Sequence, residues 1–352
     1  MNFSIGIVGL PNVGKSTLFN ALLKKTVADA ANYPFCTIEP NVGVVEVPDS
    51  RLSVLAKVVN TQKIVPAAVE FYDIAGLVKG AAEGAGLGNK FLSHIREVAT
   101  IIHVVRLFED ANVAHVSPQI NPVDDIKTIE SELILADLAT LEKQPESETA
   151  KKVSEQLNKG VPARNITLSD EEKEFLKPLN LLTVKPAIFV FNVSEEQLKK
   201  KEETENEIEE ILKQVQNDSF SYLYLCAKME ADIVILSNDE QKEYLKGFNL
   251  TESGLNRLIK KAYETLGLIS FLTAGEIEAR AWTITKGTLA PQAAGVIHTD
   301  FEKHFIKADV IPYQKFVDAG GWVKAREQGL VQTVGKDYEM KDGEVIEFKV
   351  NV

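Results

Sequence analysis

The chain has 352 residues, of which 45% are hydrophobic and 26% charged, and its formal net charge is −12 at pH 7. This length predicts two or three domains, and this composition excludes an intrinsically disordered chain, which combines low hydrophobicity with high net charge. The excess of acidic residues argues against a protein whose whole surface binds nucleic acid or an anionic membrane, because such binding needs clustered Lys and Arg. A local basic patch stays open.

The cysteine content and the start of the chain indicate the compartment. Cys36 and Cys226 lie far apart and form no CxxC pair, which argues against a disulfide framework or a thiolate metal site. The first residues lack the basic flank of a signal peptide, and a glycine-rich loop interrupts the first apolar run. No apolar run approaches the roughly 20 residues of a membrane-spanning helix. We therefore expect a cytoplasmic protein with no membrane partner.

Short apolar runs alternate with helical patterns in the first part of the chain. Strands are predicted at 3–8, 42–47, 67–72 and 100–107, and a helix at 15–25. Continuous apolar runs are typical of parallel strands that are buried on both faces. Strands alternating with helices predict a doubly wound α/β sheet.

The pattern changes between 122 and 185, where no strand is predicted. Helices are expected at 124–143, 147–159 and 169–179, the last of them behind an N-cap at Ser169. One apolar stripe on long, charged helices predicts a projecting helical hairpin, a coiled-coil insertion in the α/β domain. Ordinary helices packed on the sheet are the alternative.

The α/β pattern then resumes. Strands are predicted at 186–192 and 222–226, and helices at 202–216, 239–246 and 254–266.

After Leu268 the chain shows short alternating runs, at 281–285 and 345–350, together with turn signals. This texture predicts a small α+β module. The expected domains are the first part of the α/β domain at 1–120, the helical insertion at 121–185, the second part of the α/β domain at 186–268, and the C-terminal module at 269–352.

A phosphate-binding loop is predicted at 9–16, GLPNVGKS, which matches GxxxxGK[ST] between a predicted strand and a predicted helix. Gly9 and Gly14 let the backbone curl so that its N–H groups face the phosphates. Lys15 is expected to reach the β and γ oxygens, and the Ser16 hydroxyl to ligate Mg²⁺. The other residues assigned to this end of the nucleotide site are Pro11, Asn12, Val13 and Thr17.

A second motif, Asp73-Ile-Ala-Gly76, follows the strand predicted at 67–72. A carboxylate that holds Mg²⁺ through water and a glycine that senses the γ-phosphate belong at this position of a switch-type nucleotidase. Thr37 lies between the two motifs and is expected to ligate Mg²⁺ when a triphosphate is bound; a solvated loop threonine is the alternative. The glycine-rich stretch 76–88 predicts a segment that reorders, with a plain surface loop as the alternative.

The residues expected at the base differ from those of GTPases, where Asn-Lys-x-Asp follows the corresponding strand. Here Val193 removes the lysine stem, and Glu195 replaces the aspartate with a longer side chain that disturbs the bidentate contact with guanine. Asn192 can still pair with the N6/N7 edge of adenine. The sequence therefore predicts ATP rather than GTP. The position of the base-supporting Ser-Ala-Lys loop is occupied by Cys226, Ala227 and Lys228.

Leu77 stands where Ras-like enzymes place the glutamine that orients water, so another group must activate hydrolysis. Among the histidines, His115 follows a predicted strand in a loop-like stretch and is the candidate for a catalytic or positioning role; a structural or surface histidine is the alternative. Asn12 is a candidate to help hold K⁺ beside the phosphates, and a loop-capping role is its alternative.

Together these motifs resemble the YchF/Obg-like ATPase family of translation-factor-related P-loop NTPases. The resemblance covers the whole chain, through GLPNVGKS, YPFCTIEPN, DIAGLVKGAAEGAGLGNKFL, NVSE and FLTAGEIEARAWTITKGTLAPQAAGVIHTDFEKHFIKADV. It implies a nucleotidase core, a coiled-coil insertion and a C-terminal TGS domain with a β-grasp fold. It also implies ATP hydrolysis with Mg²⁺, stimulation by K⁺, and association with the ribosome, both 70S and the large subunit, for which contact with ribosomal RNA would need a local basic face. The family's histidine at the His115 position is proposed to act in hydrolysis, and a hydrophobic residue at the Leu77 position is typical of the family.

The leading hypothesis is thus a Mg²⁺-dependent ATPase that acts as a switch on the ribosome, with Lys15, Gly76 and His115 as its catalytic residues. One alternative is a GTPase that acts as a translation or assembly factor. The other is a nucleotide-gated ribosome-binding module whose hydrolysis is incidental.

Overall fold

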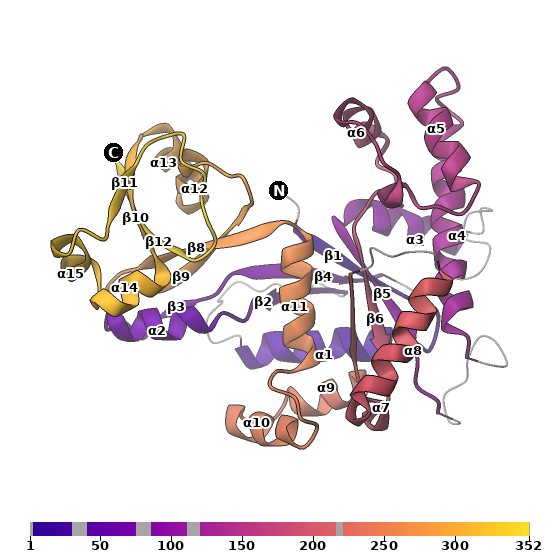
Figure 1. The fold of residues 1–352 in the computed structure, drawn as a ribbon, viewed down its shortest axis with the longest axis horizontal. Helices are drawn as coiled ribbons and strands as arrows, with labels where there is room; N and C mark the ends of the chain where they lie inside the picture. The colour runs from indigo at the N-terminus through magenta and orange to yellow at the C-terminus, as the bar shows by residue number, and fades with distance from the viewer. Residues whose placement is uncertain (1–2, 30–40, 75–85, 111–119, 216–220, 352) are drawn as a thin grey trace. The chain divides into compact units, whose positions relative to one another are not determined.

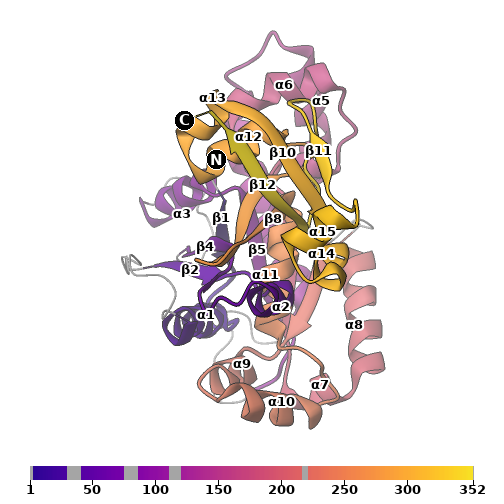
Figure 2. The same cartoon turned by 90° about the vertical axis from the view of Figure 1, so that its left-hand side faces the viewer.

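The computed structural model describes residues 3–29, 41–74, 86–110, 120–215 and 221–351 (Figures 1 and 2). The chain forms two compact units. Unit 1 is made of Met1–Ala28, Thr37–Val45 and Glu70–Leu258, and unit 2 of Asp29–Cys36, Glu46–Val69 and Ile259–Val352. Glu46–Val69 therefore groups with unit 2, although we expected it in the first part of the nucleotide-binding domain; the other expected boundaries stay predictions.

A six-stranded sheet forms the centre of unit 1. From edge to edge its strands are β2 (Val42–Glu46), β4 (Ala68–Asp73), β1 (Ser4–Val8), β5 (Thr100–Arg106), β6 (Ala187–Asn192) and β7 (Ser221–Leu225). Neighbouring strands from β4 to β7 run parallel. Every residue of β1 and β5 is buried, as expected for parallel strands covered on both faces. The predicted α/β fold class is confirmed.

Helices connect these strands (Figure 1). Their bounds are α1 (Lys15–Asp29), α3 (Gly86–Glu97), α4 (Pro122–Leu141), α5 (Glu148–Leu157), α6 (Asp170–Leu176), α7 (Glu195–Lys199), α8 (Lys201–Gln214), α9 (Ala227–Ile233), α10 (Asn238–Lys246) and α11 (Gly254–Thr265), with short 3₁₀ turns at Ala163–Asn165 and Lys177–Leu179. Helix α4 packs on β5 and α8, and so connects the helical region to the sheet.

The region between β5 and β6 is helical where the structure describes it, as the sequence predicts, and it has an apolar cluster of its own. Ser169 caps α6 through a capping box with Glu172, which confirms the predicted helix start. Asp137 of α4 is buried and accepts hydrogen bonds from the backbone N–H groups of Leu182 and Thr183, at 2.7 and 2.8 Å. These bonds fix α4 to the segment that leads into β6. The coiled-coil character of this region stays a prediction.

Unit 2 contains a second six-stranded sheet. Its strands in spatial order are β11 (Gln332–Val334), β10 (Phe305–Pro312), β12 (Glu344–Val350), β8 (Leu268–Ala274), β9 (Ala279–Thr285) and β3 (Ile64–Val65), and its helices are α2 (Ser50–Val58), α12 (Ala290–Ile297), α13 (Thr299–Lys303), α14 (Tyr313–Ala319) and α15 (Trp322–Glu327). The strands β8 and β12 are parallel neighbours near the centre, with antiparallel strands on either side. The β-grasp fold and the TGS assignment of this module stay predictions.

The core of the C-terminal module lies between its sheet and α12. Phe271 and Ile284 of the central hairpin pack there against Ala290, Ala293 and Ala294 of the helix, because alanine lets the helix approach the sheet closely. In the described part of the chain, no helix combines the length and the apolar content that crossing a membrane requires.

Candidate nucleotide-binding site

The loop between β1 and α1 has the backbone that a phosphate cradle requires. Asn12 and Gly14 both have positive φ, +63° and +94°. A Cβ atom at Gly14 would lie 2.1 Å from Nδ2 of Asn192, and one at Gly9 would lie 2.9 Å from the backbone oxygen of Val104. The loop can therefore take this path only with glycine at both motif positions.

Lys15 and Asp73 meet at the phosphate end of the site. β1 and β4 run parallel with Ile7 opposite Asp73, so Asp73 lies at the same sheet edge as the loop that follows β1. The Lys15 ammonium forms an ion pair with the Asp73 carboxylate, and both side chains are largely buried. The sequence pointed to each residue separately, and the fold brings them together.

The residues at this end fit a Mg²⁺ ion. Ser16 and Thr17 lie exposed in the first turn of α1. The Asp73 carboxylate is held at the start of this helix by its ion pair with Lys15. A hydroxyl and a carboxylate are the hard oxygen donors that Mg²⁺ prefers, and Mg²⁺ on a nucleotide usually takes only one or two protein ligands. The predicted residues Thr37, Gly76 and His115 lie outside the described residues.

A cavity of about 880 Å³ adjoins the phosphate loop at the carboxyl ends of β5, β6 and β7. Ligands of open α/β sheets bind outside this edge. The predicted base-site residues that line the cavity are Gly14, Thr17, Asn192, Val193, Glu195, Cys226, Ala227 and Lys228. Lining residues that sequence reasoning missed are Leu107, Phe108, Glu109, Asp110, Ser194, Glu196, Gln197 and Glu207.

Asn192 joins the phosphate loop to the base-supporting loop. Its Nδ2 donates to the backbone oxygen of Val13 and its Oδ1 accepts from the backbone N–H of Ala227, both at 2.9 Å. The side chain is only 4% exposed. Within the described residues these bonds leave one amide hydrogen and one oxygen lone pair for a ligand. Asn192 therefore has a structural role that the sequence did not reveal, in addition to the predicted contact with the base.

The segment after Asn192 is held by a capping box. The backbone N–H of Gln197 donates to Oγ of Ser194, and that of Ser194 donates to Oε1 of Gln197. Nε2 of Gln197 also donates to the backbone oxygen of Leu107, at 3.2 Å, which ties this segment to the end of β5. The Ser-x-x-Gln pattern could have revealed Gln197 from the sequence.

Val193 and Glu195 face different surroundings. The Val193 side chain is 1% exposed and belongs to an apolar cluster with Phe191, so it offers no stem that could cover a base. Glu195 opens the first turn of α7 and is partly exposed. Unlike Val193, Glu195 is therefore not buried in the apolar cluster.

The base-supporting loop uses its backbone donors internally. The backbone N–H of Ala227 donates to Oδ1 of Asn192, and the backbone N–H groups of Lys228 and Met229 donate to the Cys226 sulfur. Burial raises the pKa of the Cys226 thiol, which therefore stays neutral at physiological pH.

Helix α9, which follows this loop, is held by hydrogen bonds to the start of α11. The carboxylate of Glu230 accepts from the backbone N–H groups of Gly254 and Leu255, at 2.7 and 3.2 Å, and so caps the start of α11. A Cβ atom at Gly254 would lie 2.8 Å from Oε1 of Glu230, so the cap depends on glycine there.

The cavity wall is acidic. Its charged residues are Glu109, Asp110, Glu195, Glu196, Glu207 and Lys228. Burial raises the pKa of Glu207. Carboxylates accept hydrogen bonds, so this wall suits a ligand that presents hydroxyl or amine donors, as ribose and adenine do.

Arg106, at the end of β5, organises the near wall of the cavity. Its guanidinium donates to the backbone oxygens of Phe108 and Asp110, at 3.1 and 3.3 Å, and lies 4.4 Å from the centre of the Phe108 ring. His103, on the same strand, is buried, and burial lowers its pKa to about 3. This histidine is neutral and belongs to the core, as its predicted place in a strand implied.

Comparison with known proteins identifies the family. Residues 4–137 match a family described as 50S ribosome-binding GTPase, and residues 268–351 match the YchF GTPase C-terminal family, described as a protein of unknown function. The chain is 48% identical to the "Ribosome-binding ATPase YchF" of Bacillus subtilis (strain 168), with 100% of both chains covered. This chain belongs to the YchF family. The YchF relative from Escherichia coli O157:H7 is 47% identical, again over 100% of both chains.

A solved YchF structure has the same fold. The "Schizosaccharomyces pombe YchF GTPase" superimposes with a TM-score of 0.89 at 38% identity, covering 99% of this chain and 98% of that chain. The resemblance stated from sequence motifs is thus confirmed. The names of these YchF proteins differ in the nucleotide they imply, ATPase in the bacterial relatives and GTPase in the yeast one.

Proposed function

We propose that this protein is a Mg²⁺-dependent ATPase that binds ATP in preference to GTP and works as a nucleotide switch on the ribosome. The observation that carries the proposal is the Asn192 tie. The Asn192 side chain joins a glycine-dependent phosphate loop to the proposed base cavity, and the backbone N–H of Ala227 in the cavity lining already donates to it.

At the phosphate end, Lys15 exchanges the Asp73 carboxylate for the β and γ oxygens of the nucleotide. Ser16, and Asp73 through water, would hold the Mg²⁺, which would supply positive charge to the phosphate oxygens. The backbone N–H groups at the start of α1 add their own favourable potential.

At the base end, the proposal rests on hydrogen-bond complementarity. Guanine O6 is an acceptor and needs a donor, but the N–H of Ala227 is bonded to Asn192. Adenine N6 is a donor, and the remaining lone pair of Asn192 Oδ1 can accept from it while the remaining amide hydrogen donates to N7. Val193 and Glu195 supply neither the lysine stem nor the aspartate of a guanine site.

For hydrolysis we propose that His115 activates or positions the water and that Gly76 and Thr37 sense the γ-phosphate, with Thr37 as a further Mg²⁺ ligand. Leu77 has no polar atom with which to orient water. We also propose that Asn12 helps hold a K⁺ ion, which supplies the charge that an arginine finger supplies elsewhere.

The proposed partner is the ribosome, both 70S and the large subunit, in the cytoplasm. Its support is the printed name of the 48% identical relative, which calls that protein ribosome-binding. Contact with ribosomal RNA would require a local basic face on this protein.

Calorimetry with ATP and GTP tests the base argument. We expect ATP to bind at least about tenfold more tightly, a difference of about 1.4 kcal/mol. A double variant, Val193→Lys with Glu195→Asp, should shift the preference toward GTP, whereas Glu196→Asp, next to the same site, should not. A tenfold preference of the unmodified protein for GTP would refute the ATP assignment and favour the GTPase alternative.

Turnover with and without ribosomes, in K⁺ and in Na⁺, tests the switch. His115→Ala should lower turnover with little change in ATP affinity. If ribosome co-sedimentation follows ATP binding but does not change when hydrolysis is abolished, the protein is a nucleotide-gated binding module with incidental hydrolysis.

A further inference from the structure

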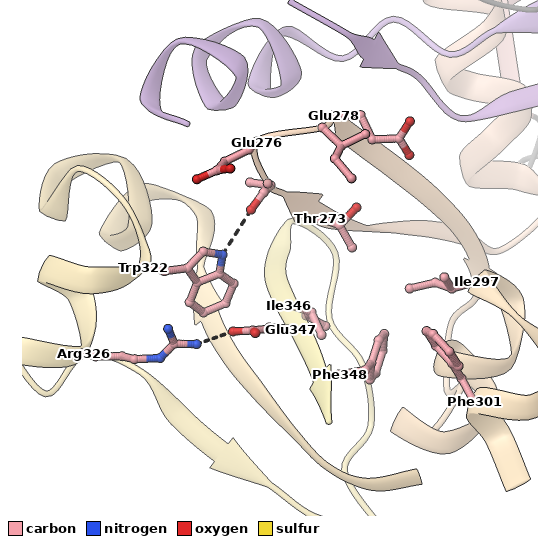
Figure 3. A pocket seen from close by; sticks show the side chains of 13 residues that line it. Thr273, Glu276, Glu278, Ile297, Phe301, Trp322, Arg326, Ile346, Glu347 and Phe348 are labelled. Carbon is pink, nitrogen blue, oxygen red and sulfur yellow. Dashed lines mark hydrogen bonds and ion pairs between the residues drawn. The ribbon is translucent and has the colours of Figure 1, made fainter. Parts of the chain in front are cut away.

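A second cavity, of about 600 Å³, lies within the C-terminal module, far along the chain from the nucleotide site. It forms where two parallel strands of the sheet separate (Figure 3). β12 pairs with β8 at Val345 and Leu272, and β12 then continues to Val350 while β8 ends at Ala274. The continuing part of β12 therefore has an edge that faces the cavity.

Backbone as well as side chains line this cavity. Ile346, Glu347 and Phe348 are consecutive residues of β12, and Thr273 to Glu278 are consecutive residues around the β8–β9 turn. Because alternate side chains of a strand point to opposite faces, three consecutive lining residues mean that the strand presents its edge. A strand edge binds an extended peptide by adding it to the sheet.

Each end of the cavity carries an aromatic side chain. Trp322 and Arg326 lie on one side of β12, and Ile297 and Phe301 lie on the other (Figure 3). Nε1 of Trp322 donates to the backbone oxygen of Ala274 at 3.2 Å, and the Arg326 guanidinium lies 5.1 Å from the indole ring. These contacts fix the indole before any ligand arrives.

The rim carries an isoleucine that nothing in the described structure covers. Ile277 in the β8–β9 turn is 81% exposed, the largest value among the exposed large hydrophobic residues described. Burying such a side chain on binding is favourable, so its place on the rim favours a partner with apolar side chains.

The charge of the lining selects the kind of partner. Its charged members are Glu276, Glu278, Glu347 and Arg326. Arg326 and Lys349 pair with Glu347, and Lys63 and Arg280 pair with Glu278. Within the described residues Glu276 has no ion pair, and its carboxylate stands on the rim (Figure 3). Among the described residues, Glu276 is thus the one charged lining residue without an ion pair, and its carboxylate favours a cationic group over a polyanion such as RNA at this rim.

We propose that this cavity binds an extended peptide with alternating basic and apolar residues, supplied by a protein of the ribosome. The peptide adds to the free edge of β12, its apolar side chains pack between Trp322 and Phe301, and a Lys or Arg pairs with Glu276. The inference rests on the proposed ribosome association and names the kind of ribosomal component that the C-terminal module contacts.

The direct test is binding of labelled probes to the full-length protein by fluorescence anisotropy. The probes are the hexapeptide Lys-Val-Arg-Val-Lys-Val, its Glu-Val-Glu-Val-Glu-Val counterpart, the basic peptide with alternate backbone nitrogens methylated, and a single-stranded uridine hexamer. We expect only the first to bind well, and to shift the Trp322 indole N–H resonance. Binding of the RNA hexamer in preference to the basic peptide, or equal binding of the methylated peptide, would overturn the proposal.

Two exposed rim positions provide variants that should fold normally. Glu276→Lys should weaken binding of the basic peptide about threefold or more, and Ile277→Asp should do so as well, whereas Asp337→Lys, an exposed acid of the same module outside the cavity lining, should not. None of these variants should change ATP turnover in the absence of ribosomes. Equal peptide affinity in all three variants would contradict the assignment.

Ribosome co-sedimentation separates this inference from the proposed function. If the unmodified protein co-sediments with ribosomes and Glu276→Lys does so equally, the cavity is not the contact and the inference fails alone. If the unmodified protein does not co-sediment in any nucleotide state, the proposed ribosome association fails, and the anisotropy series still decides whether the cavity binds basic peptides.

Discussion

Asn192→Ala is the substitution that tests most sharply how the nucleotide site is held together. The change removes two hydrogen bonds of 2.9 Å, one to Val13 and one from Ala227, from a side chain that is 4% exposed. Each bond contributes about 1 kcal/mol net, and each partner left dry costs about 1–3 kcal/mol. Because the adjoining cavity lets water reach the freed N–H of Ala227, we expect the free energy of unfolding to fall by about 2–4 kcal/mol.

Urea unfolding of the nucleotide-free protein, followed by circular dichroism, measures this loss. Hydrogen exchange at the Ala227 amide gives a local readout, because that N–H loses its acceptor and should exchange faster. Asn238→Ala, at an exposed position in the first turn of α10, is the matched control and should stay within about 0.5 kcal/mol. A variant at position 192 that unfolds at the same urea concentration, with the Ala227 amide still protected, would refute the reasoning.

Three further predictions concern the same unit. Gly14→Ala should weaken ATP binding at least about tenfold in calorimetry, because its φ of +94° and the contact with Asn192 exclude a Cβ atom; ordinary affinity would contradict the cradle geometry. Lys15→Ala should abolish measurable ATP binding while Lys24→Ala does not; retained affinity would remove Lys15 from the phosphate site. The pKa of His103 is about 3 when folded and near 6.5 when unfolded, so the unfolded chain binds the proton first and stability falls as pH falls through 6.5 toward 3. When the pH falls from 6 to 4, the free energy of unfolding, measured by urea titration, should therefore fall by about 2 kcal/mol less in His103→Leu than in the unmodified protein. An equal fall in both proteins would contradict a neutral buried histidine.

Local patterns predicted most elements of unit 1 closely. The strand predicted at 100–107 is β5, Thr100–Arg106, and the helix predicted at 254–266 is α11, Gly254–Thr265. Buried parallel strands and amphipathic helices have strong local signatures, so their sequences alone locate them to within a few residues.

Elements defined by distant partners were missed. β3 is only Ile64–Val65, and its pairing with Ala279 and Arg280 of β9 cannot be read from either segment alone. The C-terminal module was predicted as α+β from its texture, but the separation of β8 from β12, and hence the cavity there, depends on how far two strands stay in register.

The site shows the same limit. The motifs located Gly14, Lys15 and Asn192 because phosphate binding requires fixed residue types at fixed spacing. They did not reveal that the amide of Asn192 is mostly used within the protein, or that Gln197 anchors the base segment to Leu107. Such ties follow from three-dimensional proximity of segments that are far apart in sequence.

The early segment Glu46–Val69 has a consequence for how the protein is made. Its helix α2 and strand β3 pack with β8 and β9, which the ribosome synthesises some two hundred residues later, at the usual pace of about 5–20 residues per second. During that interval of ten seconds or more, Leu52, Leu55 and Val65, all buried in the finished fold, have no sheet to cover them. In a chain that ends before β8, these three apolar side chains would stay exposed. We therefore expect such a chain to aggregate or to bind chaperones, even though its phosphate loop is complete.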